Sequence, residues 1–234
     1  MRERERGPAL ELIGATLAGE LPGQDALRGV SLELRPGDLV VIRHAPGWRS
    51  GPVADAVCGL SAPREGEVRV FGRSWRSMRP RAVEHARARI GRVAERTAWV
   101  PYLTVGEGVL MAQEHHTHRP GGALREEASE LCRAFGLPDL PGVRPASLPD
   151  ADLRRAALAR AFMGRPMLLA LEHPTRGVLP TPLPALAQRL TAARLGGAAA
   201  LILTDEEEVW SSPALAATAT LEVAQGRLVR RDAA

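Results

Sequence analysis

The chain has 234 residues, a formal net charge of +4 and a hydrophobic content of 45%, values that suit one globular domain and exclude wholesale disorder. No apolar run approaches the ~20 residues that a membrane span needs, and the alternating charges of residues 1–6 predict no secretory signal. Cys58 and Cys132 lie far apart in the sequence, so we expect two reduced thiols and no metal spacing.

Short β-rich runs alternate with helical patterns along the chain. The alternating run 30–34 predicts a half-exposed edge strand, whereas the nearly continuous apolar runs 167–171 and 199–203 predict parallel strands covered on both faces. The other predicted strands are 39–42, 67–71, and a closing hairpin of 220–223 with 226–229. The pattern indicates an α/β fold with a mostly parallel sheet and an antiparallel element near the N-terminus.

Strand signals disappear between residues 96 and 164. Residues 126–135 form an amphipathic pattern, and a second helical pattern runs from Asp150 to Phe162. We therefore expect a single domain over residues 1–234, with a helical subdomain at approximately 96–164 inserted into it.

Two polar features have several interpretations. Arginine supplies all 31 basic residues, and seven of them form a basic stretch in which the other ionisable residues are Glu84 and His85: Arg73, Arg76, Arg79, Arg81, Arg87, Arg89 and Arg92. This stretch can contact nucleic acid or phospholipid head groups, although a solvated helix is the commoner explanation. His115, His116 and His118 lack a fourth ligand nearby, so we predict a solvated loop and no metal site.

Five segments occur in a recognisable order: LRGVSLELRPGDLVVI at 27–42, CGL at 58–60, GEVRVFG at 66–72, RAALARA at 155–161 and LLALEHPT at 168–175. In this order they resemble an ABC transporter ATP-binding subunit, over roughly residues 10–230. The resemblance implies a P-loop NTPase-like (RecA-like) fold with a mostly parallel sheet, an N-terminal antiparallel element and an inserted helical subdomain.

The family's phosphate loop, G-x-x-x-x-G-K-[ST], falls on residues 44–51. Its two outer glycines, its lysine and its magnesium-binding hydroxyl correspond to His44, Arg49, Ser50 and Gly51, and the interior Gly47 keeps the usual residue. No lysine exists elsewhere to substitute. Pro52 suits the first turn of a helix, so we expect only a strand-to-helix turn here, although Arg49 or Arg43 can in principle reach a phosphate.

The other motifs of the family also differ in this chain. The Walker B aspartate and general base correspond to Glu172 and His173, the Q-loop glutamine to Glu95, and the switch histidine to Asp205. Histidine can act as a base in principle, but that role would need a bound nucleotide and metal. We expect His173 to be a residue at the end of a buried strand with no catalytic duty.

The family's signature motif falls on Leu148, Pro149, Asp150, Ala151 and Asp152. Only the leucine is retained, and Asp150 would place negative charge near a triphosphate. We expect Asp150 to be the N-cap of the following helix, so that a carboxylate satisfies a helix end that phosphate satisfies in the family.

These differences predict a degenerate ABC ATP-binding subunit that does not hydrolyse ATP and acts as a structural or regulatory component docked on a membrane transporter. Its expected partner is a permease subunit, with Trp99 and Tyr102 at the contact, on the cytoplasmic face of the membrane. An intact ATPase paralogue is a second candidate partner. No cofactor is predicted, and ATP and Mg²⁺ would bind only if the altered site retains affinity. The alternatives are a slow or unconventional ABC ATPase, and a stand-alone protein that binds nucleic acid, although we expect no nucleic-acid partner.

Overall fold

The computed structural model describes residues 7–19, 25–96 and 98–230, so the charge pattern at residues 1–6 lies outside the described residues. An antiparallel sheet near the N-terminus has the strand order β2-β1-β4-β5. Its strands are β1 (Leu10–Ala18), β2 (Asp25–Leu34), β4 (Glu65–Val70) and β5 (Arg73–Ser74). The predicted edge strand at 30–34 is confirmed as part of β2.

The second sheet has the order β10-β9-β3-β8-β7-β6, and β9, β3, β8, β7 and β6 run parallel. Its strands are β3 (Leu39–Arg43), β6 (Ile90–Val93), β7 (Leu168–Glu172), β8 (Ala199–Thr204), β9 (Ala219–Ala224) and β10 (Arg227–Arg230). The predicted closing hairpin is confirmed: β10 pairs antiparallel with β9 around Gln225 and Gly226, which both have positive φ. The mostly parallel α/β architecture agrees with the sequence prediction.

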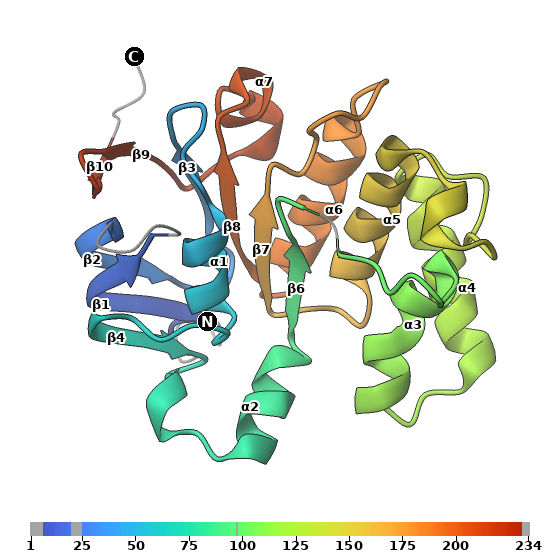
Figure 1. Cartoon of the computed structure of the whole chain (residues 1–234), viewed down its shortest axis with the longest axis horizontal. Helices are drawn as coiled ribbons and strands as arrows, with labels where there is room; N and C mark the ends of the chain where they lie inside the picture. The colour runs from blue at the N-terminus through green and yellow to red at the C-terminus, as the bar shows by residue number, and fades with distance from the viewer. Residues whose placement is uncertain (1–6, 20–24, 97, 231–234) are drawn as a thin grey trace.

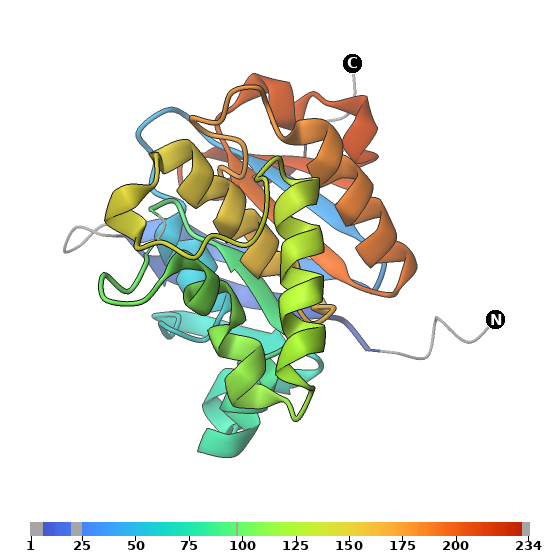
Figure 2. The same cartoon turned by 90° about the vertical axis from the view of Figure 1, so that its right-hand side faces the viewer.

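The parallel sheet separates two hydrophobic cores, because successive side chains of a strand point to opposite faces. Val41 and Ile202 face one core, whereas Ile42 and Leu203 face the other. Figure 1 shows the antiparallel sheet and α1 (Gly51–Val57) on one side of the parallel sheet, and Figure 2 shows longer helices over the other side. This burial on both faces explains why β3, β7 and β8 are nearly continuous apolar runs.

Helices fill the stretch between β6 and β7. They are α3 (Val105–His116), α4 (Gly121–Ala134) and α5 (Asp150–Phe162), while α6 (Leu183–Leu195) follows β7. No described residue between 94 and 167 lies in a strand. The predicted helices within 126–135 and at 150–162 are present, and the exact limits of the helical subdomain stay a prediction.

The basic stretch is more varied than the single helix we expected. It begins at β5, continues through a 3₁₀ turn at Trp75–Ser77 and through α2 (Pro80–Arg87), and ends in β6. A last short helix, α7 (Glu207–Trp210), follows β8 and carries two acids, Glu207 and Glu208, in its first turn. None of the helices in the described part of the chain combines the length and apolarity that crossing a membrane requires.

Candidate functional site

The loop between β3 and α1 keeps the strand-turn-helix path that the sequence predicted. The His44 amide donates to the Thr204 carbonyl on the neighbouring strand at 3.2 Å. Gly47 has φ +82°, a left-handed conformation that favours glycine, and Gly51 is the first residue of α1. Pro52 lies in the first turn, where its missing N–H leaves no hydrogen bond unmade.

Two of the predicted site positions are joined by a buried hydrogen bond. Ser50 Oγ donates to Glu172 Oε2 at 2.9 Å, and both residues are completely buried. The other oxygen, Glu172 Oε1, accepts from Arg92 Nε at 3.1 Å and from Arg92 Nη2 at 2.9 Å. Both carboxylate oxygens of Glu172 are therefore occupied by groups of this chain.

Arg92 is the cation at the centre of this network, which we call the Arg92 network: Ser50, Asp55, Arg92 and Glu172. Its Nη1 also donates to Asp55 Oδ1 on α1 at 2.6 Å. Burial works against the charge of Arg92, but Glu172 and Asp55 outweigh burial and raise its pKa. A buried carboxylate is costly without a counter-charge, so Arg92 makes a charged Glu172 tolerable in the core.

Arg92 was not predicted as a site residue, because it lies within the basic stretch of the sequence. A usable signal was present. The segment 90–93 alternates as a short strand, and in a parallel sheet that strand is a candidate neighbour of the one that ends at Glu172. An arginine beside a buried acid on adjacent strands predicts an ion pair.

Two histidines meet behind the loop. The rings of His44 and His173 lie 4.9 Å apart, edge to face, and His44 also contacts Trp48 at 4.8 Å between ring centroids. Burial, reinforced by the charge of Arg176, lowers the pKa of His173 to about 3. His173 Nδ1 lies 3.3 Å from Asp205 Oδ1, but neither of its ring nitrogens makes a hydrogen bond within the described residues. The imidazole is neutral at pH 7 and a poor proton acceptor.

The remaining acids near the loop also face arginines. Arg176 pairs with Asp205, and against the effect of burial it lowers the pKa of that carboxyl. Arg49 Nε lies 3.4 Å from Glu95 Oε2, while the buried Arg154 donates to the carbonyls of Ala94 and Glu95 at 2.7 and 2.6 Å. The fold thus brings the predicted loop, Q-loop, Walker B and switch positions together.

The prediction that Asp150 is the N-cap of its helix is wrong. The N-cap position belongs to Pro149, Asp150 is the first helical residue, and no side chain makes a capping hydrogen bond. The ring of Pro149 fixes its φ at −59°, and with ψ 149° this residue is extended, so the helix begins at Asp150, one residue earlier than we expected. Asp150 still contributes a negative charge to the first turn.

The other signature-equivalent residues make contacts within their own region. Leu148 packs against the helical core, and Ala151 is half-buried in the first turn of α5. Asp152 accepts from Arg155 Nη1 at 2.7 Å, and Arg155 also donates to the Leu179 carbonyl at 2.9 Å. This segment is held by its own helix and the loop after β7.

The two aromatic residues proposed for partner contact differ in accessibility. Tyr102 is 76% exposed. Trp99 is half-buried: it packs on the helical core and against Gly108, and Arg160 stacks over its ring at 4.4 Å. Trp99 is the less accessible of the two, because its indole fills the space beside a helical glycine, and the contact role of both residues stays a prediction.

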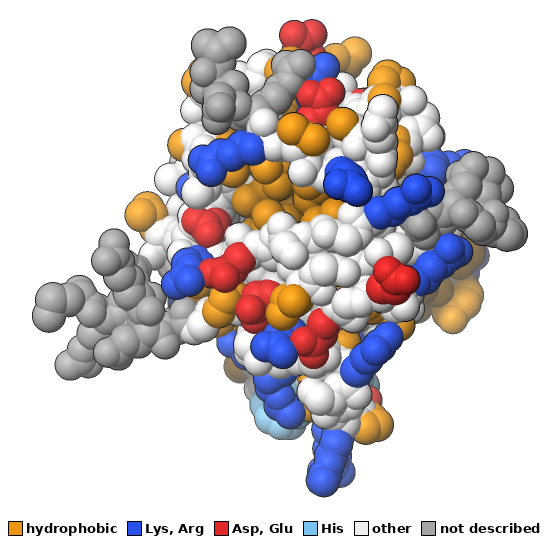
Figure 3. Space-filling view, turned by 90° about the vertical axis from the view of Figure 1, so that its left-hand side faces the viewer, with side chains coloured by type: hydrophobic (Ala, Val, Ile, Leu, Met, Phe, Trp, Pro, Cys, Tyr) orange, Lys and Arg blue, Asp and Glu red, His pale blue; other side chains and the backbone are white. Residues whose placement is uncertain are grey.

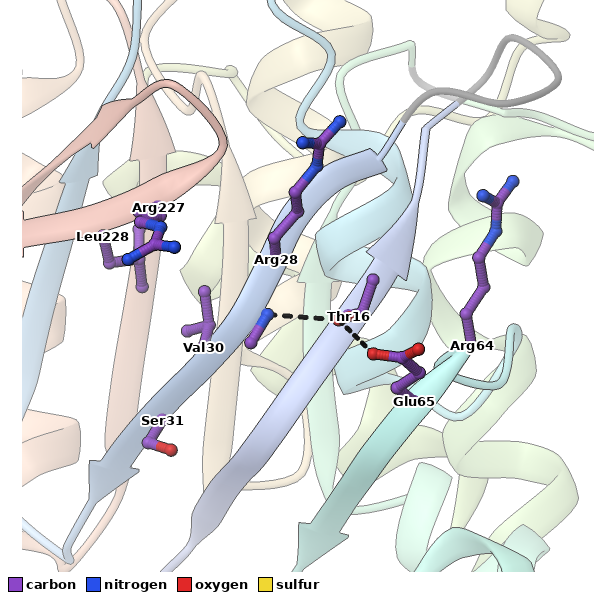
Figure 4. A pocket seen from close by; sticks show the side chains of 9 residues that line it. Thr16, Arg28, Val30, Ser31, Arg64, Glu65, Arg227 and Leu228 are labelled. Atoms are coloured by element: carbon purple, nitrogen blue, oxygen red, sulfur yellow. Dashed lines mark hydrogen bonds between the residues drawn. The ribbon is translucent and has the colours of Figure 1, made fainter.

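The histidine cluster and the surface hollows lie outside this site. His115 and His116 close α3 with their rings 4.6 Å apart, and within the described residues no group of three or more His, Cys, Asp or Glu could hold a metal ion. A hollow of about 640 Å³ opens on the antiparallel sheet and is lined by Thr16, Glu65 and three arginines (Figure 4). Neither feature includes a predicted site residue.

Comparisons with known proteins agree with this architecture. A family model described as ABC transporter matches residues 27–176. The lipoprotein-releasing system ATP-binding protein LolD of Maricaulis maris is 33% identical over 203 residues, 86% of this chain and 87% of that protein. The spermidine/putrescine import ATP-binding protein PotA of Methylococcus capsulatus is 32% identical over 149 residues, which are 63% of this chain and only 37% of that longer protein.

The fold has close structural counterparts as well. A dimeric ATP-binding cassette solved in a post-hydrolysis state with ADP and Pi aligns with a TM-score of 0.82 at 20% sequence identity. The alignment covers 94% of this chain and 96% of that one, and it supports the fold alone. On the family model and the similarity to LolD, the chain belongs to the ABC transporter family.

Proposed function

We propose that this chain is a degenerate ABC transporter ATP-binding subunit that does not hydrolyse ATP and serves as a structural or regulatory component of a membrane transporter. The observation that carries the proposal is the Arg92 network. Ser50 corresponds to the family's phosphate-binding lysine and Glu172 to its metal-orienting aspartate, and these two residues hydrogen-bond to each other. Groups that would serve nucleotide and Mg²⁺ are engaged within the protein.

The residues around the network support the same proposal. Both oxygens of Glu172 already accept hydrogen bonds, from Arg92 and from Ser50, so a metal-bound water would have to compete with groups of the protein. His173, which corresponds to the general base, is buried and neutral with a pKa of about 3. An active cassette would bind the phosphates of ATP and a Mg²⁺ ion. The residues at the corresponding positions here, Ser50, Glu172 and His173, do not fit these two groups.

The partner we propose is a membrane-embedded permease. Relatives of the chain are named as ATP-binding proteins of a lipoprotein-releasing system and of spermidine/putrescine import. A chain with this role would lie on the cytoplasmic side, peripheral to the membrane. We propose docking through the 95–110 surface, where Tyr102 offers an exposed aromatic ring and Trp99 supports the surface from beneath.

Both halves of a standard ATP site are altered in this chain. In the family, the loop of one subunit meets the signature motif of the other, so pairing with an intact paralogue would leave both sites incomplete. We propose that the chain either scaffolds the permease without nucleotide or competes with an intact subunit for the same docking surface. Each possibility predicts a monomer in solution with or without Mg-ATP.

The slow-ATPase alternative would need new phosphate ligands. Arg49 is the nearest candidate in the loop, but it lies against Glu95, and Arg43 stacks over Trp210 at 4.4 Å between its guanidinium and the ring centroid. Both arginines already have partners, and no observation favours this alternative.

The test is steady-state phosphate release from Mg-ATP by the purified chain and by His173→Ala. We expect both proteins to remain at the background rate, because the general-base position is not used. Magnesium-dependent turnover that disappears in His173→Ala would contradict the proposal. Sedimentation with and without Mg-ATP provides a second readout, and an ATP-induced dimer would contradict it too.

A further inference from the structure

One part of the surface carries arginines that form no ion pair with an acid among the described residues. We call it the basic limb: Arg73, Arg76, Arg79 and Arg81, which run from β5 through the 3₁₀ turn to the start of α2. All four residues are exposed. Figure 1 shows α2 projecting at the bottom of the molecule, and Figure 3 shows Arg side chains along that end of the face.

The charges of the basic limb are not neutralised by the fold. The side chains of Arg73, Arg79 and Arg81 make no ion pair or hydrogen bond with any residue in the described ranges, and Arg76 donates only to the Pro63 carbonyl at 3.4 Å. The adjacent Glu67 is taken by Arg69 at 2.8 Å. The limb therefore presents uncompensated positive charge to solvent.

The limb also has room for small anionic groups. Arg69, Arg73 and Arg76 line an open hollow of about 660 Å³ together with Ser74, Ser77 and one acid, Glu67, which Arg69 neutralises. The Ser77 hydroxyl donates to the Ser74 carbonyl at 3.0 Å and the Ser74 side chain bonds to Glu67, so the guanidinium groups of the hollow are the donors for phosphate oxygens. The hollow is therefore suited to phosphate head groups and not to apolar ligands.

An exposed leucine adjoins these arginines. Leu60 is 57% exposed and shares a smaller hollow of about 200 Å³ with Trp75 and Arg76. The Trp75 indole is not available for stacking, since it covers Gly59 and donates to the Val57 carbonyl at 3.3 Å. An exposed aliphatic side chain beside arginines, with no exposed aromatic ring, suits a lipid surface better than nucleic-acid bases.

We propose that the basic limb binds the anionic head groups of a membrane surface, with Leu60 entering the interface. Clustered basic residues are attracted to anionic lipid, and one apolar side chain adds contact with the acyl boundary. The binding needs neither nucleotide nor a permease, so it goes beyond the proposed function and can hold or fail independently of it.

The test is co-sedimentation of the full chain with vesicles in the absence of ATP. One set of vesicles is phosphatidylcholine, and the other contains about one third phosphatidylglycerol. The triple variant Arg73→Gln, Arg79→Gln, Arg81→Gln is compared with Arg125→Gln, Arg133→Gln, Arg144→Gln, which removes the same charge from exposed positions in the helical region. Thermal melts establish that both variants are folded.

We expect the wild-type chain to bind the anionic vesicles at least about tenfold more tightly than the neutral ones, and to lose this preference between about 0.1 M and about 0.5 M salt. The limb variant should lose more than about tenfold in affinity, and the matched control less than about twofold. Equal losses in the two variants, or no loss in the limb variant, would overturn the proposal.

A second experiment, with a DNA duplex in place of vesicles, distinguishes lipid from nucleic acid as the anionic partner. Leu60→Ser should weaken vesicle binding and leave any binding of a duplex of about 20 base pairs unchanged, because DNA offers no acyl layer. If the wild-type chain binds the duplex more tightly than the vesicles at equal phosphate concentration, the limb is a nucleic-acid surface and the lipid proposal is wrong.

Discussion

The Arg92 network and the basic limb place arginines in opposite situations. Arg92 donates to both Glu172 and Asp55 within the protein, whereas Arg73, Arg79 and Arg81 of the limb have no acidic partner among the described residues. A buried charge must be compensated internally because water is excluded, but an exposed charge is compensated by solvent. The difference separates arginines that hold the fold from arginines that can serve a partner.

The largest effect is expected when the network loses its cation. Arg92→Ala leaves the buried Glu172 without its counter-charge, so we expect a loss of about 3–5 kcal/mol in the free energy of unfolding, measured by denaturant titration. Arg69→Ala is the matched control, since its pair with Glu67 is more exposed and contributes about 0–1 kcal/mol. Similar losses in the two variants would show that the network is not a structural centre.

The buried histidine gives the next effect, as a dependence on pH. Burial holds the pKa of His173 at about 3, below the ~6.5 of an unfolded chain. The unfolded state therefore binds the extra proton between these values, and stability falls as the pH falls through that window. We expect a loss of about 1–2 kcal/mol between pH 7 and pH 5 that His173→Asn reduces. An unchanged pH slope in that variant would contradict this account.

Two helix ends sharpen the comparison between internal and solvent-facing polar groups. The Thr104 side chain and Glu107 form a complete capping box at α3, so Thr104→Ala should cost about 1 kcal/mol of stability. Asp150 makes no capping hydrogen bond at α5, so Asp150→Ala should cost only about 0.3–0.5 kcal/mol through the helix dipole. Thermal melts of both variants measure which substitution costs more stability. A larger loss for Asp150→Ala than for Thr104→Ala would contradict this prediction.

The smallest effect on stability is expected in the basic limb. The variant with Arg73→Gln, Arg79→Gln and Arg81→Gln removes exposed side chains without partners in the described structure, so each change should alter stability by less than about 0.5 kcal/mol. Denaturant titration measures this directly. A destabilisation comparable to Arg92→Ala would mean that the limb holds the fold and is not a free surface.

Much of the fold could be predicted from the sequence. The apolar runs that became β7 and β8 have a simple cause, because strands covered on both faces need hydrophobic side chains at every position. The helices α3 and α6 were missed, although Thr104 and Glu107 have the spacing of a capping box. α6 lacks a cap side chain and begins at Leu183 after two prolines, so its start had no clear signal.

The site was harder to predict because its contacts join distant segments. The resemblance identified Ser50 and Glu172 separately, but their hydrogen bond spans 122 positions of sequence. Arg92 was assigned to a solvated stretch because that stretch contains six other arginines. Its contact with Glu172 becomes visible only when β6 is paired with β7. Asp150 was predicted to be the N-cap, but it is the first residue of the helix, because Pro149 takes the N-cap position.

The central claim is that the Arg92 network occupies the groups that nucleotide and Mg²⁺ would need. Isothermal titration calorimetry of the full chain with Mg-ATP tests it most directly. We expect no saturable binding below about 1 mM, an affinity that corresponds to about −4 kcal/mol. A micromolar dissociation constant that weakens in Ser50→Ala or Glu172→Gln would show that these residues still serve nucleotide, and it would contradict the claim.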